Sequence, residues 1–200
     1  MLRRSSASPF MPDAYVFPGG TIDPVDRQGG NPPGWDAQRL AAEFRSSFPT
    51  ELPPDQPPIS IDDARALVRA AVREVAEEAD IRLDAATLHL FSHWITPVSE
   101  PRRYNTFFFV APAPEGQHGR ADAVETHDAR WISPAEALAA AGRGEMRIIY
   151  PTIKHLKRIA AFTSAQELLG YARSKPIVTI MPGEVSEDEF GMPLGLEDAW

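Results

Sequence analysis

The chain has 200 residues, with 28 acidic residues against 20 lysines and arginines, and its formal net charge is −8. This charge argues against a nucleic-acid-binding protein that works by bulk attraction, because neutralising phosphates requires a basic face. The absence of cysteine excludes disulfides, thiol nucleophiles and zinc sites built on cysteine.

The hydrophobic content of 43% supports a globular core. The length predicts a single domain over residues 1–182, followed by an acidic tail over residues 183–200. No segment approaches the roughly 20 apolar residues of a membrane-spanning helix, and the first residues lack the apolar run of a signal peptide. We therefore expect a cytoplasmic protein that has neither a nucleic acid nor a membrane as its partner.

Patterns of polar and apolar residues predict strands and helices that alternate along the chain. Leu2 to Arg4 resemble the end of a strand, so either the sheet edge is short or the true start lies upstream. Further strands are predicted at residues 14–18, 87–96, 103–111, 128–132 and 177–181, and helices at residues 60–79, 134–141, 150–162 and 164–173. The phenylalanines at 107–109 are expected to alternate between the two faces of their strand. This order predicts an α/β or α+β fold with a layered sheet.

A proline-rich segment over residues 27–58 interrupts this order. Seven prolines and three glycines surround a helical pattern at residues 36–48. We interpret the segment as an inserted helix on two stiff arms. It acts as a passive linker, as a lid or as a dimer contact, and the sequence leaves these alternatives open.

The most informative segment is the long helix that begins after Ser60. Ser60 is a good N-cap residue because an acid, Asp63, follows three residues later. Apolar residues then recur at helical spacing and form one face. At about 100° per residue, Glu74, Glu77 and Glu78 share a sector beside this face, and Glu78 lies nearest the core.

The three glutamates form either a solvated acidic face or a metal-binding cluster. Like charges three or four residues apart repel each other, and a carboxylate that leans into the core is costly unless it is paired or binds a cation. Only Arg73 is placed to offset Glu77. Three oxygen donors without a soft ligand suit Mg²⁺ or Mn²⁺. The geometry of the helix alone leaves both alternatives open.

The segment Arg73-Glu-Val-Ala-Glu-Glu-Ala-Asp-Ile81 resembles the core of the Nudix hydrolase box. Phe17-Pro-Gly-Gly20 resembles the start of that box, and Asp26 stands where the family has an acid. Between the two parts lie 46 residues, from Arg27 to Val72, where the family normally has a short connection. The branch of coenzyme A diphosphatases carries an insertion there, and it also resembles this chain at Phe10–Gly20 and Trp94–Pro97.

This resemblance implies a Nudix-type α/β/α sandwich with a mixed sheet and an inserted helical segment. It implies a Mg²⁺- or Mn²⁺-dependent diphosphatase whose partner is a small-molecule nucleotide diphosphate. The leading substrate is coenzyme A or acyl-CoA, cleaved to 3′,5′-ADP and (acyl-)4′-phosphopantetheine, and ADP-ribose and NADH are alternatives. A non-catalytic module that senses a nucleotide is an alternative of another class. Homodimers are common in the family.

The resemblance also assigns roles to residues. It implies that Glu74, Glu77 and Glu78 are metal ligands, that Glu77 and Glu78 are the principal ones, and that Arg73 orients them for catalysis. Glu125 is the candidate general base. The alternatives are that Glu125 is an exposed loop acid without a role, or that Glu77 or Glu78 serves as the base.

Six further residues are candidates for substrate contact. They are Arg4, Gly19, Gly20, Trp94, Arg102 and Arg103. The glycines would allow close approach of the backbone, the arginines either bind phosphates or lie exposed, and the tryptophan either stacks on a base or belongs to the core.

Two departures from the family pattern carry expectations. Asp80 replaces the glycine that ends the box helix, and we expect it to adopt a left-handed conformation. Asn105 and Phe107 stand where the branch has an acid and an arginine, which bears on the identity of the substrate.

Overall fold

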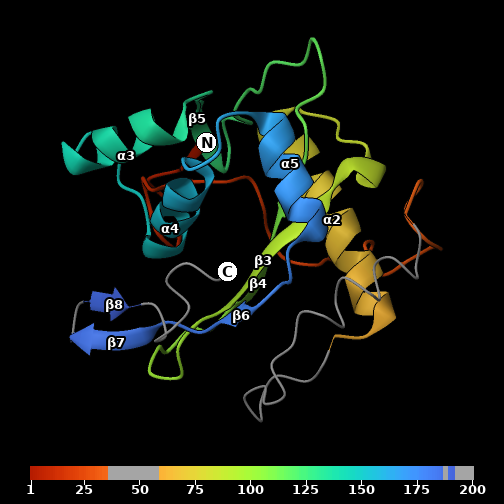
Figure 1. The fold of residues 1–200 in the computed structure, drawn as a ribbon, viewed down its shortest axis with the longest axis horizontal. Helices are drawn as coiled ribbons and strands as arrows, with labels where there is room; N and C mark the ends of the chain where they lie inside the picture. Colours follow the sequence, from red (N-terminus) through yellow and green to blue (C-terminus); the bar gives the residue numbers. More distant parts are fainter. Residues whose placement is uncertain (36–58, 187–188, 192–200) are drawn as a thin grey trace.

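The computed structural model describes residues 1–35, 59–186 and 189–191 (Figure 1). The strands are β1 (Leu2–Arg4), β2 (Tyr15–Val16), β3 (His89–Ile95), β4 (Asn105–Val110), β5 (Thr126–Ala129), β6 (Thr179–Ile180), β7 (Gly183–Ser186) and β8 (Glu189–Gly191). The helices are α2 (Ile61–Ala79), α3 (Pro134–Gly142), α4 (Tyr150–Ile159) and α5 (Ala165–Ser174), with a 3₁₀ turn, η1, at Ala85–Thr87. The helix expected at residues 36–48 lies outside the described residues. No helix in the described ranges is long and apolar enough to cross a membrane.

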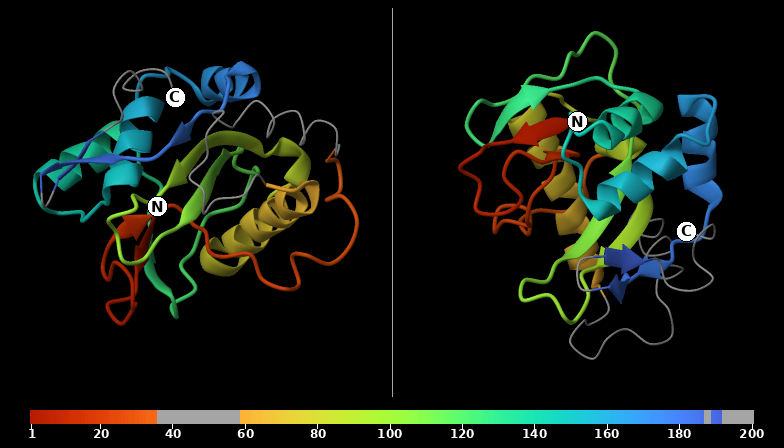
Figure 2. Two further views of the ribbon diagram at one scale, coloured as in Figure 1. Left: turned by 90° about the horizontal axis from the view of Figure 1, so that it is seen from below. Right: turned by 90° about the vertical axis from the view of Figure 1, so that its left-hand side faces the viewer.

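The central sheet has the strand order β4-β3-β6 and is mixed, as predicted. Strand β3 is antiparallel to β4 and parallel to β6, and every residue of β3 is buried. Figure 2 shows α2 against one face of this sheet and α4 and α5 against the other. The three layers form the α/β/α sandwich that was expected.

Apolar side chains on both faces of the sheet hold the layers together. Leu88 and Leu90 pack with residues of α2 on one side, whereas Phe91 and Trp94 pack with residues of α4 and α5 on the other. The predicted alternation on β4 is confirmed, because Phe107 and Phe109 join the first cluster and Phe108 joins the second.

A second sheet, with the order β2-β1-β5, lies beside the end of α2. Leu2 of β1 packs with Ala79 and Ile81, so the N-terminal strand is tied to the last turn of α2. The strand predicted at residues 128–132 begins two residues earlier and ends at Ala129, because it forms only where β1 offers a partner. The sheet was expected to be single, and the structure divides it into two three-stranded sheets.

Both ends of α2 follow from local sequence. The Ser60 side chain accepts a hydrogen bond of 3.0 Å from the Asp63 amide, which confirms the predicted N-cap. Asp80 ends the helix in a left-handed conformation, with φ 54° and ψ 36°, and its N–H donates to the Val75 carbonyl. The expectation for Asp80 is therefore confirmed, since aspartate tolerates this conformation better than most residues.

Two C-terminal expectations change. The predicted strand at residues 177–181 is reduced to the two residues of β6, which pair with β3. Part of the expected acidic tail forms a small antiparallel pair, β7 with β8.

Candidate active site

Helix α2 presents its three glutamates in very different environments. The Glu78 residue is only 5% exposed, and its Oε2 accepts a hydrogen bond of 2.8 Å from the Gly19 amide. The Glu74 side chain is 13% exposed, whereas that of Glu77 is 60% exposed. The helix therefore carries two carboxylates into a largely dry region and leaves the third in contact with solvent.

Burial changes the acidity of the two inner carboxyl groups. Loss of hydration raises the pKa of Glu78 to about 7, although the hydrogen bond from Gly19 acts in the opposite direction. Burial also raises the pKa of Glu74, and the hydrogen bond and charge of Arg73 oppose this increase. The negative charge of Glu125 raises both values further. A cation that binds between or beside two such carboxylates stabilises their ionised forms.

Arg73 links the helix to the loop that follows β2. Its Nη1 donates to Glu74 Oε1 and to Glu77 Oε2, each at 2.8 Å. Its Nε and Nη2 donate to the carboxylate of Asp26 at 3.2 and 2.8 Å, and Nη2 also donates to the Thr21 carbonyl at 3.0 Å. Arg73 thus contacts two of the three glutamates and can fix their orientation.

Asp26, which was not among the predicted site residues, is held by Arg73 beside the glutamates. It is 3% exposed, and its carboxylate also accepts a hydrogen bond of 2.8 Å from the Asp23 amide. Burial opposes ionisation, but the hydrogen bonds from Arg73 and the Asp23 amide outweigh it and lower the pKa of Asp26. The signal was present in the sequence, since Asp26 occupies the acidic position of the family pattern.

The loop from Gly19 packs closely on the glutamates. A Cβ atom added to Gly20 would overlap the carboxylate of Glu74, so only glycine fits this approach without a shift of Glu74. Together with the hydrogen bond from Gly19 to Glu78, this contact brings the two predicted glycines to the glutamates.

Glu125 reaches the same region from the loop before β5. The carboxylate of Asp122 accepts hydrogen bonds from the backbone amides of Val124, Glu125 and Thr126. The Thr126 hydroxyl lies 3.3 Å from the Glu78 carbonyl oxygen, which ties this loop to α2. Glu125 itself is exposed and its charge acts on the two inner carboxylates, so its position fits an acid or base beside the glutamates.

The predicted substrate contacts are divided between two places. Arg4 lies near Glu78, whose carboxylate it stabilises electrostatically, and its guanidinium donates to the Ser8 hydroxyl. Arg102 lies over the ring of Tyr104 at 5.6 Å, and Arg103 Nε donates to the Thr96 carbonyl at 3.1 Å. The latter two arginines are therefore anchored in the connection between β3 and β4.

Trp94 lies in the core rather than on an exposed surface. It is 3% exposed, and its ring centroid is 5.4 Å from that of His155 and 6.3 Å from that of Tyr150. This placement favours the core alternative for Trp94 over stacking on a base.

The donor chemistry of the site fits a hard divalent cation. The available ligands are carboxylate oxygens without sulfur or imidazole, and the buried pair has raised pKa values that a cation would lower. In the described part of the chain, no three Asp, Glu or His side chains already converge as a metal-binding group. Arg73 and Gly19 instead hold the carboxylates by hydrogen bonds.

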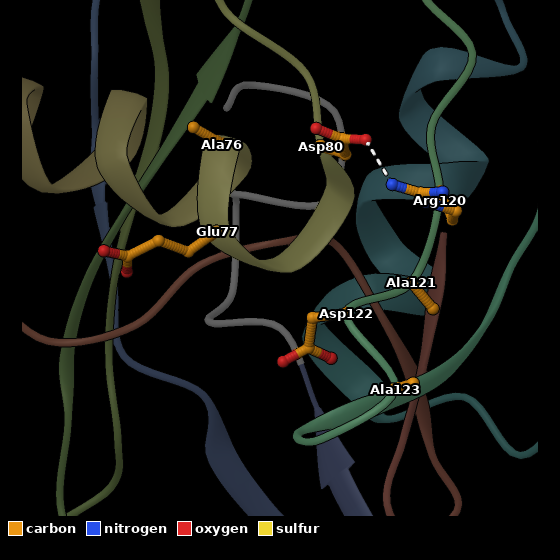
Figure 3. Close-up of a pocket in the computed structure, with 7 residues that line it drawn as sticks. All are labelled: Ala76, Glu77, Asp80, Arg120, Ala121, Asp122 and Ala123. Atoms are coloured by element: carbon orange, nitrogen blue, oxygen red, sulfur yellow. Dashed lines mark hydrogen bonds and ion pairs between the residues drawn. The ribbon is translucent and has the colours of Figure 1, made fainter.

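A cavity of about 460 Å³ opens beside Glu77, between the last turn of α2 and the loop that precedes β5 (Figure 3). It is lined by Ala76, Glu77, Asp80, Arg120, Ala121, Asp122 and Ala123. Its volume falls within the range of small-molecule sites in proteins.

Comparisons with known proteins agree with this geometry. Residues 60–153 match the family model of the NUDIX domain. The chain is 26% identical to "Putative nudix hydrolase 7" of Caenorhabditis elegans, covering 80% of this chain and 55% of the relative. It is 26% identical to "Acyl-coenzyme A diphosphatase NUDT19" of Homo sapiens, covering 84% of this chain and 62% of the relative. The protein of the same name in Gallus gallus is 24% identical, with 88% and 64% covered.

The chain thus spans about three fifths of the length of these curated relatives. Among solved structures, the crystal structure of a NUDIX hydrolase from Alicyclobacillus acidocaldarius superposes with a TM-score of 0.62 at 22% identity, covering 84% of this chain and 86% of the other. This likeness establishes the fold. Residues 60–153 thus match the NUDIX domain model, and the chain is similar in sequence and in fold to Nudix hydrolases.

Proposed function

We propose that this protein is a divalent-metal-dependent diphosphatase that cleaves coenzyme A or acyl-CoA to 3′,5′-ADP and (acyl-)4′-phosphopantetheine. The observation that carries the proposal is the pair of buried carboxylates, Glu74 and Glu78, held beside Arg73 and against the glycine loop. The choice of substrate is supported by two relatives that are named acyl-coenzyme A diphosphatases.

The residues have distinct tasks in this proposal. Glu74, Glu77 and Glu78 hold Mg²⁺ or Mn²⁺, and Arg73 sets the orientation of two of them. When bound, the metal ion neutralises the diphosphate, activates water and stabilises the leaving oxygen. Glu125 accepts the proton of the attacking water, because it is exposed and close enough to act electrostatically on Glu78.

The negative charge of the carboxylates explains why a cation must bind before the anionic substrate does. A diphosphate is anionic, and the region around Glu78 is already negative through Glu74 and Glu125. Without a metal ion the substrate would be repelled. Arg4 lies on the same side and supplies a positive charge toward the phosphates.

The test is an analysis of products formed from coenzyme A, ADP-ribose and NADH with Mg²⁺ or Mn²⁺. We expect 3′,5′-ADP and 4′-phosphopantetheine from coenzyme A, and we expect Glu77→Gln to lose most of this turnover. Glu145→Gln is the matched control, because Glu145 is an exposed acid paired with Arg143 away from the site. Unchanged turnover in Glu77→Gln would reject the metal assignment. Faster cleavage of ADP-ribose or NADH would reject the substrate, and binding without cleavage of any diphosphate would favour a sensor.

A further inference from the structure

Glu77 lines the cavity, whereas the buried Glu74 and Glu78 are not among its lining residues. Its walls are the last turn of α2 and the backbone of residues 120–123, as Figure 3 shows. Ala76, Ala121 and Ala123 contribute only methyl groups, so the walls are short and leave room for a ligand.

Arg120 is the one cationic side chain among the described residues that line this cavity. Its backbone amide donates to the Ala79 carbonyl at 2.8 Å, which fixes its Cα at the end of α2. Its guanidinium is held at 3.0 Å from Asp80 Oδ2, but the two side chains are 80% and 62% exposed. An ion pair this exposed is weak, so a more highly charged anion can replace Asp80 as the partner of Arg120.

The other two acids that line the cavity, Asp122 and Glu77, already have partners other than Arg120. Asp122 uses its carboxylate to accept hydrogen bonds from three backbone amides and the Thr126 hydroxyl. Glu77 is paired with Arg73. An anion that enters the cavity therefore finds its favourable contact at Arg120.

An exposed aromatic ring lies beside Gly119, the residue before this arginine. Trp131 is 64% exposed, and its indole nitrogen is 3.7 Å from the position that a Cβ of Gly119 would occupy. Gly119 directly precedes Arg120, so the indole lies near the backbone segment that carries Arg120. A flat exposed ring next to a cation is an arrangement that suits a nucleobase next to a phosphate.

We propose that this cavity is the subsite for the nucleotide end of the substrate, with Arg120 binding a ribose phosphate monoester and Trp131 stacking on the base. The inference rests on the proposed function and adds the residues that recognise the nucleotide. Asp80 follows Glu77 by three residues, a rise of about 4.5 Å along the helix. The residue that pairs with Arg120 therefore lies about one helical turn from Glu77 along the axis of α2.

The test is calorimetric titration of the whole chain, in the presence of Mg²⁺, with adenosine 3′,5′-bisphosphate and with AMP, which lacks the 3′-phosphate. We expect the bisphosphate to bind about tenfold or more tightly than AMP, and Arg120→Ala to remove this preference. Arg120→Lys should retain part of it. Arg143→Ala serves as the control, because Arg143 pairs with Glu145 on the exposed end of α3. Trp131→Ala should weaken both nucleotides about fivefold or more, whereas Trp131→Phe should not.

Equal affinities for the two nucleotides, or an unchanged preference in Arg120→Ala, would overturn the subsite. The two proposals fail separately. If Arg120→Ala hydrolyses coenzyme A with the same KM as the wild type, the subsite proposal is contradicted and the diphosphatase proposal is not. If the protein discriminates between the two nucleotides but hydrolyses no diphosphate, the diphosphatase proposal is contradicted and the subsite proposal is not.

Discussion

Replacing Asp26 by asparagine should destabilise the fold substantially, because it breaks the link between the glycine loop and α2. Asp26 is 3% exposed and accepts three hydrogen bonds, two from Arg73 and one from the Asp23 amide. Removing one partner of a buried ion pair costs about 3–5 kcal/mol. Arg73 keeps Glu74, Glu77 and the Thr21 carbonyl, so we expect about 3 kcal/mol, at the lower end of this range.

The assay is urea unfolding at pH 7, followed by circular dichroism. With a dependence of about 1–3 kcal/mol per molar urea, the midpoint of Asp26→Asn should fall by about 1–3 M. Asp62→Asn is the matched control, since Asp62 pairs with Arg65 while 80% exposed, and it should change stability by about 0.5 kcal/mol or less. A free energy of unfolding for Asp26→Asn within about 0.5 kcal/mol of the wild type would refute this reasoning.

The ion pair between Asp26 and Arg73 also predicts how the free energy of unfolding changes with pH. The pKa of Asp26 is lower in the folded chain than in the unfolded chain. The contribution of the pair is therefore complete above the unfolded pKa of about 4 and is lost as the pH falls through the lower, folded value. The difference in stability between the wild type and Asp26→Asn should shrink over that interval.

Three further predictions concern single residues. Asp80→Gly should be at least as stable as the wild type and about 1 kcal/mol more stable than Asp80→Ala in thermal unfolding, because residue 80 is left-handed; equal stability of the two variants would contradict this. Gly20→Ala should displace Glu74 and reduce turnover with little change in melting temperature, whereas Gly170→Ala, where nothing lies near the new Cβ, should leave turnover unchanged. Burial lowers the pKa of His155 to about 4, so the folded chain keeps it neutral while the unfolded chain binds a proton below about pH 6.5, and stability falls between these two values. The advantage of the wild type over His155→Gln should therefore decrease by about 3 kcal/mol between pH 7 and 4, and a constant difference would show that His155 does not titrate in this way.

The parts of the fold that local sequence controls could be predicted. Ser60 and Asp80 mark the ends of α2 because capping and left-handed termination depend on single residues. The alternation of residues 107–109 depends only on the period of a strand. The burial of Glu78 followed from its angle to the apolar face of the helix.

Features that depend on distant partners could not be predicted. The bounds of β5 are set by its pairing with β1, which lies at the other end of the chain. The ties between Arg73 and Asp26 join residues 47 positions apart, and helical geometry could not reveal them. The cavity beside Glu77 arises where residues 120–123 meet the end of α2, and nothing in the local pattern of Arg120 indicated that contact.

The most direct test of the account is a titration of Mn²⁺ into the wild type and into a variant with Glu74, Glu77 and Glu78 replaced by glutamine. We predict saturable binding by the wild type at pH 7 and its loss in the triple variant, with Glu145→Gln behaving like the wild type. Mn²⁺ binding of equal affinity in the triple variant, confirmed as folded by circular dichroism, would contradict the claim that these carboxylates hold the metal ion.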